Sequence, residues 1–239
     1  MVRPRSSTAE SFEEGRLPAP PRPGTRSRFG REDVEFSRAI GFVDATFAIA
    51  ATLLVTTLIP GPKAWSSWSD LYDAVAGPFL AFAISFVVIA AYWFGNHQFV
   101  ASLDALTPRV VVATLWLLAF VVLLPFTTDG LGRDLGSAEV TTVVYAVNVA
   151  LVSTAEWVIY RVAVQQGLFR NPPSRIEANA STLCQLLPSA VFLVSIAIAL
   201  LWSPSAARWS WLSLLVLSPI AGRWANRRIA AADGTPLAS

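Results

Sequence analysis

The side chains of this chain that could do chemistry are few, and they lie inside long apolar segments. Asp44 lies in the first third of an apolar run that begins near Phe36, and Asn148 and Glu156 lie eight residues apart in another. An ionisable group in hydrocarbon costs roughly 2.5–3.5 kcal/mol on insertion scales, so it usually faces a protein interior or a water path. These residues therefore point to a polar interior or an ion path within a membrane.

The motifs of common enzymes and metal centres do not accompany these residues. The chain contains no H-E-x-x-H, no G-x-S-x-G and no phosphate-binding loop, and its single histidine, His97, cannot build a histidine-rich metal centre. The single cysteine, Cys184, lies in an apolar segment, which excludes a disulfide framework and a cysteine metal site. We expect a protein that is not an enzyme and that needs no cofactor and no resident metal.

The elements that must position these groups are membrane-spanning helices. The 239 residues are 54% hydrophobic and 14% charged, with a mean hydropathy of +0.53, whereas a soluble domain carries about 25% charged residues. About 20 apolar helical residues cross the hydrocarbon, and an open strand edge cannot lie in lipid. The sequence predicts an all-α polytopic membrane protein with six spans, at residues 36–59, 72–95, 109–128, 139–163, 181–202 and 208–223.

The distribution of positive charge predicts the orientation of these spans. Basic residues gather in the N-terminal tail, in alternate loops and at the C-terminus, whereas the other three loops hold one each: Lys63, Arg133 and Arg208. Cytoplasmic segments carry the excess of Lys and Arg. Both termini are therefore expected in the cytoplasm, which requires an even number of spans and is satisfied by six.

Three regions are expected along the chain. Residues 1–32 are rich in Arg and Pro and are expected to form a disordered cytoplasmic tail, residues 33–224 the six-helix domain, and residues 225–239 a short cytoplasmic tail. The arginines of the first tail are widely spaced and no DNA-binding fold follows them, so nucleic acid is not an expected partner. No apolar signal-peptide core precedes residue 36, so no cleaved signal peptide is expected.

One face of the first span carries a regular pattern. Ala45, Ile49, Thr52 and Thr56 are spaced by four, three and four residues, so they share a narrow helix face with two hydroxyl groups. Small residues and threonines are also enriched where membrane helices pack together. The spacing alone leaves two interpretations open, helix packing and the lining of a pore.

The sequence around Asp44 resembles a known signature. Residues 38–54 read R-x-x-x-F-V-D-A-x-F-A-I-A-x-T-L-L, which is similar to the R-x-x-x-F-S-D first-helix signature of the transmembrane protein 175 family of potassium channels, found in lysosomes and many bacteria. Residues 92–99, with a tryptophan and a histidine, resemble the end of that family's second helix. Residues 121–128 resemble the exit of its third helix.

The resemblance implies a potassium-permeable cation channel in a bacterial plasma membrane, built as a homotetramer whose first helices line the pore. The implied constriction is Ile49, five residues after Asp44, where a ring of isoleucines would form an apolar neck. No T-V-G-Y-G filter occurs in the chain, so the expected discrimination among cations is modest. The implied pore-lining residues are Ala45, Ile49, Thr52, Leu53 and Thr56. The expected partners are potassium ions, the lipid bilayer and further copies of the chain.

A polar network is expected to hold the first helix in place. Arg38 and Asp44 are six residues apart, so they cannot pair along their own helix and need partners on other helices. The topology brings His97 of the second span and Thr114 of the third to the same depth. In relatives, the motif arginine, serine and aspartate join such a histidine, whereas this chain has Val43 at the serine position. A His97 that contacts only water at the interface is the alternative.

Two further alternatives stay open. Glu156 lies near the cytoplasmic end of its span and five residues before Arg161, so it is either an interfacial, Arg-paired acid or a proton-coupling carboxylate of a transporter. For the whole chain, the alternative to a channel is a small secondary transporter or a structural membrane protein. Transporters commonly contain inverted repeats and broken helices at the midplane. The chain shows no inverted repeat, and its Gly and Pro interruptions fall at span ends, which favours the channel.

Overall fold

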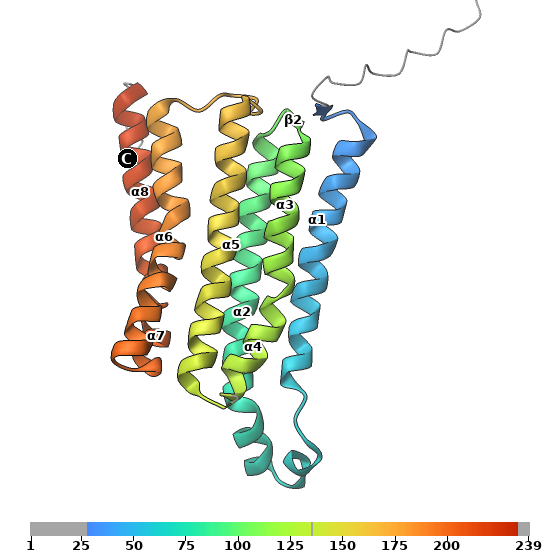
Figure 1. The fold of residues 1–239 in the computed structure, drawn as a ribbon, viewed down its shortest axis with the longest axis vertical. Coiled ribbons are helices and arrows are strands. Elements are labelled where there is room, and N and C mark those ends of the chain that lie inside the picture. Colours follow the sequence, from blue (N-terminus) through green and yellow to red (C-terminus); the bar gives the residue numbers. More distant parts are fainter. Residues whose placement is uncertain (1–27, 135, 234–239) are drawn as a thin grey trace, which may run out of the picture.

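The computed structural model describes residues 28–134 and 136–233, and it shows a bundle of helices that run side by side (Figure 1). The predicted all-α class is confirmed, with the addition of two strands of two residues each. The elements in chain order are β1 (Phe29–Gly30), α1 (Val34–Leu53), η1 (Leu54–Leu58), η2 (Pro62–Ser66), α2 (Trp68–Ser102), β2 (Ala105–Leu106), α3 (Pro108–Val122), α4 (Leu124–Arg133), α5 (Ala138–Gln166), α6 (Arg175–Leu201), α7 (Pro204–Ser210) and α8 (Ser213–Asp233).

Five helical stretches in the described residues are long and apolar enough to cross a membrane, which confirms the prediction of several membrane spans. They are 34–58, 68–102, 108–133, 138–166 and 175–201. The sixth predicted span, 208–223, is divided between α7 and α8, and its end lies within α8 rather than at a helix terminus. The second half of α8 carries Arg223, Arg227 and Arg228, so this helix is less apolar than the others. The count of six spans and the cytoplasmic location of both termini stay predictions.

Two helix boundaries differ from the predicted ones for local reasons. The third predicted span is interrupted at Leu123, because Pro125 lies in the first turn of α4, where its missing N–H is tolerated and a new helix can start. The last helix, α8, continues to Asp233 through residues that were expected to form a tail. The arginines of α8 are spaced as on a helix with one apolar side. A count of charges alone does not detect this spacing and therefore predicts a polar tail.

The predicted N-terminal tail also departs from expectation at its end. Residues 28–32 are placed in the structure, where β1 pairs antiparallel with β2, the short strand between α2 and α3. The remainder of that predicted tail, residues 1–27, lies outside the described residues, as do residues 234–239 of the C-terminal one. We call the end of the bundle that carries β1 and β2 the strand end, and the opposite end, at residues 134–138, the loop end.

The helices lie side by side across the bundle, with α1 at one edge and α8 at the other (Figure 1). α5 packs on α3, α4 and α6, α2 packs on α4, and α1 packs on α2 and α3, while α7 and α8 pack on α6. Fully buried side chains of α3 and α5, among them Leu117, Val121, Tyr145, Val149 and Val152, form the centre of the core. The edge position leaves one side of α1 uncovered.

Glycines permit the close approach of α2 and α4 near the loop end. A Cβ added to Gly132 would lie 2.8 Å from the Cα of Pro78, and one added to Gly77 would lie 2.9 Å from the carbonyl oxygen of Gly132. Both distances are shorter than atoms can tolerate, and the obstructing atoms belong to the backbone. Only glycine therefore allows this crossing, which places α4 beside α2.

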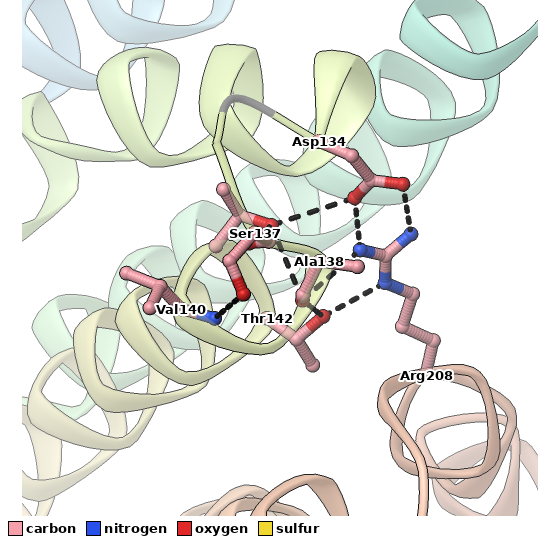
Figure 2. Close-up of polar contacts among 7 residues, drawn as sticks. Asp134, Ser137, Ala138, Val140, Thr142 and Arg208 are labelled. Atoms are coloured by element: carbon pink, nitrogen blue, oxygen red, sulfur yellow. Dashed lines mark hydrogen bonds and ion pairs between the residues drawn. The ribbon is translucent and has the colours of Figure 1, made fainter.

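An arginine of α7 fastens the last helices to the α4–α5 turn at the loop end (Figure 2). The Arg208 guanidinium forms an ion pair with the Asp134 carboxylate, and its Nε donates to the Thr142 hydroxyl at 2.8 Å. Asp134 ends α4 in the left-handed conformation with φ of 46°. Arg208, a topology marker in the sequence, thus acquires a structural role.

Candidate functional site

The five side chains expected to line a pore share one exposed side of α1 and η1, which we call the α1 face: Ala45, Ile49, Thr52, Leu53 and Thr56. Within it Ile49 is 56% exposed and Leu53 is 42% exposed. On the opposite side, Phe47, Ala50 and Leu54 are buried against the neighbouring helices. The single chain therefore packs one side of α1 and leaves the α1 face to lipid or to other subunits.

The two exposed hydroxyls of the α1 face donate hydrogen bonds inward, to their own helix. The Thr52 hydroxyl donates to the carbonyl of Ile49 at 2.8 Å, and the Thr56 hydroxyl donates to the carbonyl of Leu53 at 2.7 Å. A hydroxyl has one hydrogen and two lone pairs. Because the hydrogen is used on the backbone, the oxygen presents lone pairs outward, which suits a cation and not an anion.

The geometry of the chain changes within this face. After Leu53 the α-helix continues as the 3₁₀-helix η1. Side chains three residues apart eclipse one another in a 3₁₀-helix, so Thr56 lies nearly in line with Leu53. The last turn of the α1 face therefore keeps an aliphatic side chain and a hydroxyl on the same side of the helix.

The hydrogen-bond partner of Asp44 is a tryptophan of α2. Trp93 Nε1 donates to Asp44 Oδ1 at 2.9 Å, and the His97 ring stacks on the Trp93 ring with 5.6 Å between centroids. The structure therefore brings Asp44 and His97 to the same place, with Trp93 between them. Trp93 was not among the residues expected in the network, although its position one helical turn before His97 places both on one face of α2.

Arg38 and Thr114 do not join this contact. Arg38 is exposed on α1, and neither ion pair found in residues 28–134 and 136–233 involves it. The Thr114 hydroxyl donates to the carbonyl of Val110 on its own helix at 2.9 Å. Thr114 and Val43 line a cavity of about 60 Å³ between α1, α2 and α3. Since Val43 stands where the signature has serine, the contact of α1 with α3 at this depth is apolar.

At the strand end, two arginines fasten the segment that precedes α1. Arg31 Nη1 donates to the carbonyls of Ala101 and Leu103, at 3.0 and 3.1 Å, where α2 ends. Arg28 Nη2 donates to the carbonyl of Gln166, the last residue of α5, at 2.6 Å. The last carbonyls of a helix lack partners within it and carry partial negative charge, so a guanidinium there satisfies them and opposes the helix dipole.

At the loop end, an arginine of α4 holds the far end of η1. Arg133 Nη2 donates to the carbonyls of Thr57 and Ile59, at 3.2 and 3.1 Å. The same guanidinium is oriented by an ion pair with Asp129, one helical turn earlier, at 2.7 Å. The helix that carries the α1 face is thus fixed before its start, in its middle by Asp44 and Trp93, and after its end.

Comparison with known proteins identifies the segment that carries this arrangement. Residues 38–125 match the model of the family described as endosomal/lysosomal potassium channel TMEM175. The resemblance of this chain to the TMEM175 family is confirmed. A curated potassium channel of Chryseobacterium sp. (strain P1-3) is 28% identical over 98 residues, which make up 41% of this chain and 49% of that protein. The match therefore spans about half the length of this curated relative.

Solved structures of TMEM175 proteins share the fold. The crystal structure of a lysosomal potassium-selective channel TMEM175 homolog from Chamaesiphon Minutus superposes with a TM-score of 0.65 at 24% identity, covering 80% of this chain and 98% of that chain. The structure of a variant of the potassium channel MtTMEM175 gives a TM-score of 0.59 at 17% identity, covering 85% and 98%. The likeness in fold thus extends beyond residues 38–125 into the helices that follow α4.

Proposed function

We propose that this chain is a subunit of a potassium-permeable cation channel whose pore is lined by the α1 face. The observation that carries the proposal is the α1 face itself. It combines an exposed isoleucine with two threonine oxygens whose lone pairs point outward, on a helix that is otherwise packed and fixed at both ends. The family match over residues 38–125 and the curated relative named a potassium channel support it.

The proposed assembly is a homotetramer in a bacterial plasma membrane. Each chain contributes one α1 face, so a closed path needs several copies around an axis. The position of α1 at the edge of the bundle supports this arrangement, because copies can bring their α1 helices together while the other helices stay outside (Figure 1). The surrounding helices, with exposed apolar side chains such as Phe86 on α2 and Leu193 on α6, would then face lipid.

In the proposed pore, Ile49 and the threonines have different tasks. A ring of Ile49 side chains forms a narrow apolar neck, which admits an ion only when water accompanies it. Thr52 and Thr56 oxygens, one and two turns further along, replace part of the lost hydration. These groups are hydroxyls rather than a rigid cage of carbonyls, so the preference for potassium over sodium is expected to be modest.

Asp44 has a positioning role in this proposal. Its carboxylate is half-buried and accepts a hydrogen bond from Trp93, so it anchors α1 to α2 instead of facing the ion. A charge-assisted bond of this kind is stronger than one between neutral groups. Arg38, His97 and Thr114 are proposed to support the placement of α1 in the assembled channel.

Ion flux through the purified protein in liposomes tests the proposal. With potassium inside and an impermeant cation outside, the protein should pass potassium down its gradient without any second substrate. Ile49→Ala should raise the flux or weaken the preference for potassium over sodium, because it widens the neck. Protein that is folded by circular dichroism and silent in this assay, or that moves potassium only with a coupled gradient, would contradict the channel and favour the transporter.

A further inference from the structure

A cavity of about 100 Å³ lies between α2, α5 and α6, away from the α1 face. Four of its lining side chains carry polar atoms, and they come from three helices: Asn96 of α2, Glu156 and Tyr160 of α5, and Gln185 of α6. The carboxylate lies close to the α2 backbone, since a Cβ added to Gly95 would be 3.8 Å from Glu156 Oε1. The cavity therefore gathers oxygen atoms from three helices that are distant in sequence.

The buried oxygens of this cavity lack partners. Glu156 Oε1 and Gln185 Oε1 are both shielded from solvent, and neither accepts a hydrogen bond from any residue in 28–134 or 136–233. Asn96 is only 7% exposed. A buried acceptor without a donor is costly, and a buried carboxylate more so, because the charged form loses its hydration. Two such acceptor atoms at one cavity call for a donor or a cation beside them.

The charge of Glu156 has no counter-charge in the described part of the chain. The two ion pairs there belong to Asp129 and Asp134, and the Arg161 pairing that the sequence left open for Glu156 does not form. The cavity lining contains no Lys, Arg or His. Across the residues described, no cluster of three acidic, His or Cys side chains could hold a metal ion. One carboxylate balances one positive charge, so a divalent ion would stay uncompensated.

We propose that this cavity binds one hydrated alkali-metal cation, with the Glu156 carboxylate as its counter-charge and the amide oxygens of Gln185 and Asn96 as further ligands. Carboxylate, amide and water oxygens are the ligands of hard cations. Since a water molecule takes about 30 Å³ of liquid volume, the cavity holds an ion and one or two waters. The bound ion would join α2, α5 and α6 at a site separate from the proposed pore, and this inference does not rest on the channel.

Thermal unfolding of the full-length purified protein tests the proposal. At pH 8 and constant ionic strength, replacing N-methyl-D-glucamine chloride by sodium or potassium chloride should raise the Tm of the wild type. The rise should be about 4 °C at an ion concentration about tenfold above Kd, because only the folded state has the site. Comparing sodium with potassium identifies the preferred ion. Glu156→Gln should abolish the ion-dependent rise, and Gln185→Met should shift it to higher ion concentration.

Glu139→Gln is the matched control, because Glu139 is an exposed acid on the same helix, and it should keep the full rise. Any stabilisation by ions in the proposed pore is common to the wild type and the three variants and cancels in the comparison. The proposal is overturned if the wild type and Glu156→Gln respond alike to sodium and potassium. It is also overturned if the wild type ignores both ions but is stabilised by acid through Glu156, since the site then takes a proton.

Discussion

Hydroxyl side chains occupy two regions of this molecule with opposite surroundings. On the α1 face, Thr52 and Thr56 are exposed and bond only to their own helix. In the interior, the Thr128 hydroxyl lies 2.6 Å from the carbonyl of Leu124 on its own helix and also 2.7 Å from Ser85 Oγ on α2. Ser85 in turn donates to the Tyr145 hydroxyl on α5 at 3.1 Å. The interior groups are completely buried and join α4, α2 and α5 to one another.

The difference shows how a polar group in a membrane helix is to be interpreted. A hydroxyl that bonds across helices is part of the packing, and its loss leaves partners unsatisfied in a place without water. A hydroxyl that bonds to its own backbone and faces outward is available to an ion or to a neighbouring subunit. The comparison predicts that substitutions in the interior change stability, whereas the same substitutions on the α1 face change permeation.

The largest expected effect is at Tyr145, the centre of the interior region. Its ring packs against Trp211 and Phe192, with centroids 5.1 and 6.4 Å away. Tyr145→Ala should reduce the free energy of unfolding by about 3–5 kcal/mol, as other truncations of buried aromatic side chains do. Ile49→Ala, a truncation on the α1 face, should change it by less than about 0.5 kcal/mol. Thermal unfolding in detergent measures both, and equal losses would remove the distinction between the regions.

An intermediate effect is expected where the two regions meet, at the bond between Trp93 and Asp44. Trp93→Phe removes the indole donor to the carboxylate and should cost about 1.5 kcal/mol, the low end of the range for hydrogen bonds to charged groups, because Trp93 is 40% exposed. Asp44→Asn should weaken the same contact. Both variants should assemble less well or gate abnormally while keeping the wild-type permeability ratio of potassium to sodium in reversal-potential measurements. A changed ratio in well-assembled protein would instead place Asp44 in the ion path.

The smallest effect on stability is expected on the α1 face, when one substitution is made in both regions. Thr128→Val removes a buried donor and should cost about 1–3 kcal/mol of stability, with little effect on the potassium preference of the remaining folded channels. Thr52→Val has the same chemistry on the α1 face and should leave the unfolding temperature within the range of ordinary surface changes, while it lowers potassium flux. If Thr52→Val proved the more destabilising of the two, the α1 face would be a packing surface.

The sequence predicts the helices of this fold better than it predicts the hydrogen bonds that hold the helices in place. Hydropathy locates the first five spans, and the helix period places the α1 face on one side, because both depend on the order of residues along one segment. The contacts that fix α1 depend on backbone carbonyls at helix ends. Any residue supplies such a carbonyl, so nothing in the sequence marks Arg31 or Arg133 as its donor.

Within the candidate site, the sequence predicts that His97 lies near Asp44, but it does not predict the contact of Asp44 with Trp93. The position of His97 relative to Asp44 follows from the depth of two spans, but the distance between two helices decides which side chain reaches the carboxylate. Here the longer indole of Trp93 does so. The cavity at Glu156 is lined by three helices, and its lining is known only once these helices are placed relative to one another. The sequence alone therefore identifies the buried acid but not the cavity around it.

Cysteine accessibility shows directly whether the α1 face lines the conduction path. In a Cys184→Ser background, Ile49→Cys and Leu193→Cys place single thiols at positions that are 56% and 55% exposed in one chain. A water-soluble thiol reagent should block potassium flux through the Ile49→Cys protein and leave the Leu193→Cys protein, whose thiol would face lipid, unaffected. Flux that continues through fully active Ile49→Cys protein under the reagent, or an equal block of both proteins, would contradict the account.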